Sequence, residues 1–217
     1  MNKLLTAFAV SAVALSGYSV NAASHVKQGW NTTVTAGVAQ NKMKVKNIVA
    51  TARNTSKKSV AANLGLRLGH TWAIKEKYFA GINLLAGYNF ADTKFTEIPG
   101  DAAINYKPRF NFGLGLIGGT CVSETVNTYL ALNFLREQSR IIAKDFVTGT
   151  KDTTKFHAYT LTPLLGVSGR LADKMSWLAE AGYKFELSKG GLKKTGLKKY
   201  VKGPKGFVAN VGVTYHF

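Results

Sequence analysis

The chain is dominated by segments in which apolar and polar residues alternate with a period of two. Residues 206–217 show the pattern most fully, because every second side chain from Phe207 to Phe217 is apolar and those between are mostly small or polar. An extended strand places successive side chains on opposite faces. The alternation therefore predicts a strand with one continuous apolar face that ends on an aromatic residue.

Seven earlier segments repeat this alternation. They cover about residues 29–40, 60–72, 78–90, 109–116, 126–134, 159–168 and 177–187. On each, aromatic and aliphatic residues on one face oppose Gly, Asn, Thr or charged residues on the other; Leu64, Leu66 and Leu68, for example, oppose Gly65 and Arg67. We expect Pro163 to cause a bulge or strand end and Pro108 to mark an end, because proline has no ladder donor.

The links between these segments are alternately short and long. Short turns are expected at about residues 73–77, 119–124 and 171–174, and long links at about 41–59, 91–105, 138–155 and 188–205. Tilted strands of about ten residues cross a bilayer. The pattern predicts an all-β, eight-stranded antiparallel up-and-down transmembrane β-barrel, with four short periplasmic-side connections or termini and four long extracellular loops. Closure would pair every backbone group in the hydrocarbon.

Aromatic residues gather near the two ends of the expected strands, as in the interfacial girdles of membrane barrels. The inner girdle is expected to contain Trp30, Trp72, Trp177, Tyr78, Tyr215 and Phe217. The outer girdle is expected to contain Tyr88, Phe90, Tyr106, Phe110, Phe134, Phe156, Tyr183, Phe185 and Phe207.

The N-terminal segment has the features of a secretory signal peptide. A short positive region ends at Lys3, an apolar region covers residues 4–15, and small residues precede an expected cleavage site after Ala22. We therefore expect a signal peptide at 1–22 and the barrel domain at 23–217. No internal apolar run approaches the ~20 residues of a transmembrane helix, which excludes a helical membrane protein. The single cysteine, Cys121, excludes an internal disulfide and multi-cysteine metal sites.

The signal peptide, eight alternating strands, aromatic girdles and terminal Phe217 together resemble the small eight-stranded outer-membrane barrel families: the OmpA, OmpX and Ail type barrels and the opacity-type surface proteins. The resemblance implies a bacterial outer-membrane location with the loops facing the exterior. It also implies outer-membrane lipid and lipopolysaccharide as surroundings, recognition of the C-terminal strand by the barrel assembly machinery, and a monomer. Such families include adhesins, serum-resistance factors, structural proteins and a few enzymes.

The expected interior is polar. Arg67, Arg109, Glu180, Lys184 and Glu186 fall on the inward face together with many Asn and Thr residues. These side chains can form either a charged pore or a filled hydrogen-bonded core. The filled core is favoured because eight strands leave room only for side chains, whereas aqueous channels belong to barrels of about sixteen strands.

The net charge of +18 is concentrated in two links that contain no acidic residue. They carry six and seven basic residues, together thirteen of the chain's 29. Both links flank the expected closure between the first and last strands, so we expect one ligand-binding surface. Its residues are Lys42, Lys44, Lys46, Arg53, Lys57, Lys58, Lys189, Lys193, Lys194, Lys198, Lys199, Lys202 and Lys205.

A positive surface of this kind attracts anionic partners. An anionic host polysaccharide or acidic protein is one candidate, while solvation or contact with lipopolysaccharide phosphates is the alternative. Nucleic acid is not expected because the loops lack a series of interleaved aromatics for base stacking, Tyr200 being their single aromatic residue. The sequence thus indicates a surface-interaction barrel, such as an adhesin, or a protein that stabilises the envelope, with a small-solute porin as the alternative. A soluble lipocalin-like barrel is disfavoured, because it would carry its bulky apolar face inward.

An enzyme is disfavoured. By position only His157 lies near the outer rim, with Asp145 and Asp152 in the adjoining link, and an adjacent hydroxyl nucleophile is missing. A lipid A-modifying enzyme is therefore the least favoured reading. We expect no catalytic residue, no metal site and no cofactor.

Overall fold

The computed structural model describes residues 27–45, 55–75, 77–90, 92–98, 102–145, 149, 151–190 and 201–217. The expected signal peptide lies outside these residues. Nine strands are present: β1 (Gly29–Val45), β2 (Thr55–Ile74), β3 (Tyr78–Asn89), β4 (Thr93–Ile98), β5 (Ala102–Cys121), β6 (Val126–Asp145), β7 (Lys151–Ala172), β8 (Met175–Gly190) and β9 (Val201–His216). Over the described ranges, no helix has the length and apolar character needed to cross a membrane.

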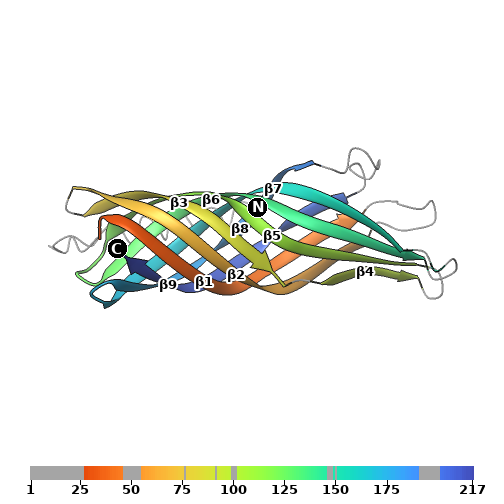
Figure 1. Cartoon of the computed structure of the whole chain (residues 1–217), viewed down its shortest axis with the longest axis horizontal. Helices are drawn as coiled ribbons and strands as arrows, with labels where there is room; N and C mark the ends of the chain where they lie inside the picture. Colours follow the sequence, from red (N-terminus) through yellow and green to blue (C-terminus); the bar gives the residue numbers. More distant parts are fainter. Residues whose placement is uncertain are drawn as a thin grey trace.

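The strands form one closed antiparallel ring (Figure 1). The order is β3-β2-β1-β9-β8-β7-β6-β5, and pairing between β3 and β5 closes the circle. Because β4 follows β3 and pairs with the outer part of β5, β3 and β4 occupy one position and the ring has eight. At the end of the β1–β9 seam the Phe217 N–H donates to the Trp30 carbonyl at 3.1 Å. The predicted fold class is confirmed.

The two faces of the ring differ as predicted. Leu64, Leu66 and Leu68 are exposed on the exterior, while Arg67 between them is buried in the lumen. Tyr78 and Tyr88 on β3 are ten residues apart, about 33 Å along a strand. With the tilt of membrane barrels this corresponds to an apolar band of about 25 Å. The exterior therefore matches the hydrocarbon thickness of a bilayer.

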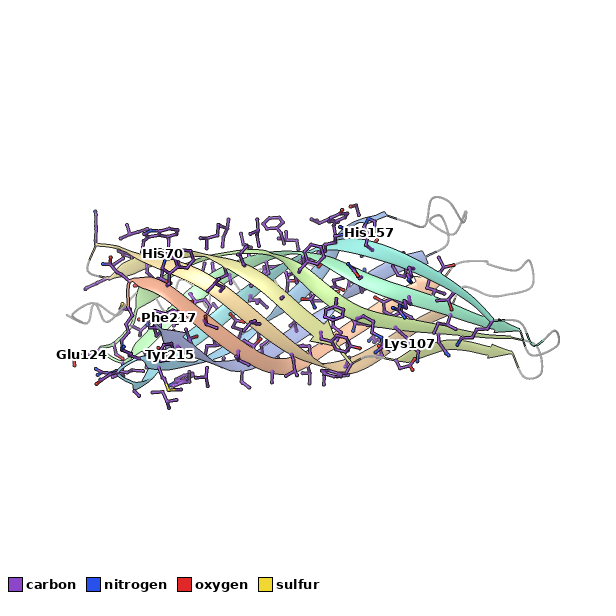
Figure 2. All side chains as sticks on the ribbon, viewed as in Figure 1. His70, Lys107, Glu124, His157, Tyr215 and Phe217 are labelled. Atoms are coloured by element: carbon purple, nitrogen blue, oxygen red, sulfur yellow. The ribbon has the colours of Figure 1, made fainter. Side chains whose placement is uncertain are left out.

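The inner girdle is confirmed, because all six of its predicted members are exposed. Figure 2 shows Tyr215 and Phe217 at one end of the barrel and His157 and Lys107 toward the other. In the outer girdle, Phe90, Phe110, Phe134, Phe185 and Phe207 are exposed and Tyr88 and Tyr183 are half-buried.

The placement of Tyr106 and Phe156 in the outer girdle is wrong. Both are buried, with only 1% and 3% of their surface exposed, and their ring centroids lie 6.0 Å apart. The Tyr106 hydroxyl is 3.0 Å from the Ser139 hydroxyl. Phe156 lies three positions before the outward Tyr159 on the same strand, so it points into the lumen. Tyr106 is turned inward by a bulge. These rings fill the outer part of the lumen.

The bulge lies in β5 between Pro108 and Asn111, where the register against β6 shifts. Pro108 therefore does not end a strand as predicted. The extra residue reverses the parity of everything before it, which turns Arg109 from its predicted inward position to the exterior. There its guanidinium donates to the Tyr88 hydroxyl at 3.0 Å.

Pro163 causes neither the predicted bulge nor a strand end. It lies inside β7 opposite Leu132 of β6, in a continuous register. The bridges to β8 are interrupted between Leu161 and Leu164, although the register is the same on both sides. The missing proline N–H is therefore accommodated by a local gap in one ladder.

Several strands extend far into the links that were predicted to be loops. β5 and β6 remain paired from Cys121↔Asn127 to Ala102↔Asp145. A 20-residue strand spans about 66 Å, about twice the length that a tilted strand needs to cross a bilayer. Figure 1 shows β4 and the far ends of its neighbours projecting at one end of the barrel. Alternation could not reveal these extensions, because outside the membrane neither face of a strand has to be apolar.

The lumen is filled by paired charges and by apolar side chains. Arg67 donates to both carboxylate oxygens of Glu180, with one contact of 2.7 Å, and the Tyr129 hydroxyl donates to Glu180 at 3.0 Å. Lys184 lies 3.1 Å from Glu137 and donates to Asn41 at 2.8 Å. The polar core expected from Arg67, Glu180 and Lys184 is confirmed, with Glu186 half-buried.

The apolar part of the lumen was not predicted. Phe79, Tyr129, Ala131 and Leu164 form a buried cluster against which Ile117 and Val208 pack. Tyr129 lies across Gly166 of the neighbouring strand, where an added Cβ would be 2.3 Å from the ring. The glycine is therefore required by the close approach of the tyrosine ring.

Candidate anion-binding surfaces

Many of the thirteen predicted ligand-binding residues belong to strands rather than loops. Lys42 and Lys44 lie in β1, Lys57 and Lys58 in β2, Lys189 in β8, and Lys202 and Lys205 in β9. The remaining six, Lys46, Arg53, Lys193, Lys194, Lys198 and Lys199, lie outside the described residues. Side-chain burial is described for Lys42, Lys58 and Lys205, of which the last two are exposed and Lys42 is half-exposed.

The strand register brings the two Lys-rich segments together. Lys42 of β1 pairs with Lys58 of β2 on one side and with Lys205 of β9 on the other. All three share the parity of exposed exterior residues such as Val38, Val60 and Phe207. We call these three residues the lysine row. Neighbouring strands are about 4.8 Å apart, so three positive charges lie side by side across the seam.

This arrangement is electrostatically unfavourable by itself. Like charges directly opposite each other on adjacent strands destabilise the pairing. Lys44 and Lys202 form a further Lys–Lys backbone pair beyond the lysine row. An anion above the seam would relieve this repulsion, and long lysine side chains are well suited to reach it as point charges.

Two cavities in the lumen are bounded by the luminal charges. A cavity of about 90 Å³ in the middle of the lumen is lined by Arg67, Glu137 and Lys184, among others. A second cavity of about 460 Å³ lies at the end that carries the short turns, and Arg67 also lines it. Arg67, tied to Glu180, thus stands between the two spaces.

The one histidine expected near the outer rim lies on the exterior. His157 of β7 is opposite Gln138 of β6, and its ring centroid is 5.5 Å from that of Tyr159. Asp145 ends β6, and Asp152 lies near the start of β7 opposite Ala143. In the described part of the chain, no three His, Cys, Asp or Glu side chains are grouped so that they could hold a metal ion.

Sequence reasoning missed one basic site on the outer wall. A groove of about 510 Å³ runs over β3, β5, β6 and β7. We call it the arginine groove; its basic residues are Arg109, Arg136, Arg140, Lys155 and His157. Neither of the long links flanking the barrel seam contributes to it. The change from apolar to basic residues along the outward face of residues 130–140 was the available signal, but the bulge that brings in Arg109 is not visible in the sequence.

Comparisons with known proteins add solved structures of similar topology. No family model matches the sequence, and no curated protein matches it either. The attachment invasion locus protein Ail of Yersinia pestis is 13% identical, with 88% of this chain and 100% of that chain covered and a TM-score of 0.45. Ail in complex with the heparin analogue sucrose octasulfate gives 13%, 87%, 99% and 0.43 in the same order.

Neisserial surface protein A is 14% identical, with 86% of this chain and 97% of that chain covered and a TM-score of 0.48. Ail and Neisserial surface protein A are eight-stranded outer-membrane barrels. The closed ring and the apolar exterior of this chain are the physical evidence for the type of its fold. The chain is an eight-stranded antiparallel β-barrel of the type found in bacterial outer membranes.

Proposed function

We propose that this protein is a non-enzymatic surface barrel of the outer membrane that captures anionic ligands through its two Lys-rich segments. The observation that carries the proposal is the lysine row, in which Lys58, Lys42 and Lys205 lie on three adjacent strands. The end of the barrel with the long connections faces the outside of the cell. The lysine row and the adjoining segments therefore face the surroundings of the cell.

The chemistry of the surface favours a sulfated or carboxylated polymer. Closely spaced ammonium groups act as point charges that attract a linear polyanion without demanding one geometry. A heparin-like polysaccharide carries repeated anions at short intervals, and an acidic protein is the second partner of the same charge. The two Lys-rich segments contain a single aromatic residue, Tyr200, whereas proteins that bind single-stranded nucleic acid stack successive bases on several aromatic side chains.

The lumen does not favour the porin alternative. The Arg67–Glu180 pair and the Tyr129 ring occupy its middle, and the rings of Tyr106 and Phe156 lie farther out. Eight-stranded barrels have room only for side chains. We therefore expect no discrete conductance steps when the protein is inserted into planar bilayers; regular steps would favour the porin.

The remaining partners follow from the same placement. The N-terminal 1–22 segment is proposed to be removed on export, and the C-terminal strand β9 is proposed to be recognised by the barrel assembly machinery. Outer-membrane lipid and lipopolysaccharide surround the exterior. A monomer is sufficient, because ring closure leaves no strand edge to pair with a second copy.

The test is retention on heparin resin as a function of salt. Full-length barrel in detergent is compared with K42Q/K58Q/K205Q, which neutralises the lysine row, and with K193Q/K194Q/K198Q/K199Q. The matched control is K75Q/K77Q/K174Q. It removes as many positive charges as the row variant, but from the opposite end of the barrel. Screened electrostatic binding weakens as salt rises, so both test variants are expected to elute at clearly lower salt.

The control is expected to elute with the wild type. Equal retention of the row variant and the wild type would contradict a role for the row. Equal weakening by the control would show that only the net charge matters. Heat-modifiable gel migration and far-ultraviolet circular dichroism establish that each variant is folded.

A further inference from the structure

The exterior of β5, β6 and β7 changes from apolar to basic at nearly one level. Along β6 the outward positions run from Leu132 and Phe134 to Arg136 and Arg140. On the neighbouring strands the change comes about one outward position later, because Arg136 is opposite Phe112 of β5 and Tyr159 of β7, and Arg109 and His157 follow these residues farther out. The transition follows immediately on Phe134, a member of the outer aromatic girdle. The arginine groove therefore lies at the outer membrane–water interface.

The groove concentrates positive charge without a carboxylate among its lining residues. Arg140 is opposite Lys155 on β7, and the bulge adds Arg109 from β5. Strands in this region are about 4.8 Å apart. A single phosphate-sized group above β6 would thus be within reach of cations from three strands.

No described carboxylate neutralises the arginine and lysine charges of the groove. Arg136, Arg140 and Lys155 form no ion pair with any described carboxylate, whereas the adjacent Lys107 is paired with Asp92. The Arg136 Nε is buried, and among the described residues it has no hydrogen-bond partner. A buried polar nitrogen without a partner is costly, so the described residues leave part of the hydrogen-bonding capacity of Arg136 unused.

Aromatic rings form the floor of the groove. The Arg136 guanidinium carbon lies 5.7 Å from the centre of the Phe112 ring, and that of Arg109 lies 5.8 Å from the Tyr88 ring. Tyr88 in turn packs on Phe110, with ring centroids 5.1 Å apart. Such stacking holds the planar guanidinium groups in fixed orientations. Fixed arginines can donate two parallel hydrogen bonds to a phosphate.

The wall on the membrane side of the groove is apolar. Phe112, Leu114, Leu132 and Phe134 are each more than 40% exposed there. A ligand with an anionic head and hydrocarbon chains would place its head in the groove and its chains along this wall. A soluble anion would use only the first of these surfaces.

We propose that the arginine groove binds the phosphorylated sugar headgroup of an outer-leaflet glycolipid, whose acyl chains lie against the apolar wall of β5 and β6. The site is separate from the lysine row and does not depend on ligand capture there. It rests only on the placement of the barrel in the membrane. Binding would orient the barrel against the lipid surface and leave the Lys-rich segments to other anions.

The test measures binding of bisphosphorylated lipid A to the purified full-length barrel in detergent, by native mass spectrometry with titrated lipid. R136Q/R140Q is expected to weaken binding by ~10-fold or more, because two charge-assisted contacts to phosphate are lost. R136K/R140K is expected to recover part of the affinity. The control K75Q/K174Q removes two charges at the opposite end and is expected to bind like the wild type.

Two further ligands identify the source of the phosphate. Lipid A without its phosphates is expected to bind the wild type weakly. Its affinity should be no higher than that of bisphosphorylated lipid A for R136Q/R140Q. Glucosamine 1,6-bisphosphate, which has no acyl chains, is expected to bind at least ~10-fold more weakly than lipid A. If it binds as tightly, the site is one for a soluble phosphate and the lipid assignment is wrong.

Equal binding of lipid A by wild type and R136Q/R140Q would overturn the proposal. If that variant fails the heat-modifiability test of folding, K155Q/H157Q at the rim of the groove provides the same comparison. K42Q/K58Q/K205Q is expected to keep lipid A binding, and R136Q/R140Q is expected to keep retention on heparin. The two proposals can therefore fail independently.

Discussion

The barrel contains two sets of basic side chains, of which one is paired with carboxylates and the other is not. In the lumen, Arg67 is paired with Glu180 and Lys184 with Glu137. On the outer wall, Arg136 and Arg140 face no described carboxylate, although they lie on the same strand as the luminal Glu137. The difference follows from the surroundings. The lumen has no other source of counter-charge, whereas the exterior meets membrane lipid and water.

This contrast separates structural from available charge. A buried ion pair is costly to break because the remaining partner stays buried and uncompensated. An exterior arginine near water loses little stability when it is removed. Basic residues of the lumen should therefore govern folding, and those of the outer wall should govern binding.

The largest effect is expected from breaking the luminal pair. E180A leaves Arg67 without its carboxylate and the Tyr129 hydroxyl without an acceptor. We expect a loss of about 3–5 kcal/mol in the free energy of unfolding. The measurement is reversible denaturant unfolding in lipid vesicles, followed by tryptophan fluorescence.

Replacing the pair as a whole sharpens this test. R67M/E180L removes both charges and keeps apolar volume in the lumen, so it is expected to recover most of the loss. If the double variant were as unstable as E180A, loss of packing rather than an unpaired charge would be the cause.

A smaller effect is expected from crowding the lumen. In G166A the new methyl group would lie 2.3 Å from the Tyr129 ring, which must move away from Glu180. Overpacking of this kind costs about 1–3 kcal/mol, measured by the same unfolding experiment. G118A is the matched control, because the nearest atom to its added Cβ is 4.0 Å away on the exterior. An equal loss in both variants would argue against a tightly filled lumen.

The smallest effect on stability is expected on the outer wall. R136A removes a charge that no described carboxylate pairs with, together with the contact between its guanidinium group and the Phe112 ring. We expect the free energy of unfolding in vesicles free of lipopolysaccharide to change by less than about 0.5 kcal/mol. A loss comparable to that of E180A would mean that Arg136 is structural, which would weaken its assignment to a lipid headgroup.

The sequence by itself determined the eight positions of the ring, the faces of the membrane-spanning parts of its strands and the inner girdle. Each of these depends on local alternation, since a residue such as Leu66 must face lipid if Arg67 faces the lumen. It also located the two basic segments, because charge is a property of composition. The luminal partners Glu180 and Arg67 could be placed on the inward face in the same way, but their pairing could not.

Only the tertiary structure decided where the alternation breaks and which strands extend beyond the membrane. The bulge between Pro108 and Asn111 reverses the parity of β5, so that Tyr106 enters the lumen and Arg109 leaves it. A bulge is defined by pairing with another strand, and local periodicity does not record it. The same non-local register brings Lys42 beside Lys58 and Lys205, and Arg140 beside Lys155. Alternation within a strand fixes the face of each residue, whereas the neighbours across strands are fixed by closure of the ring.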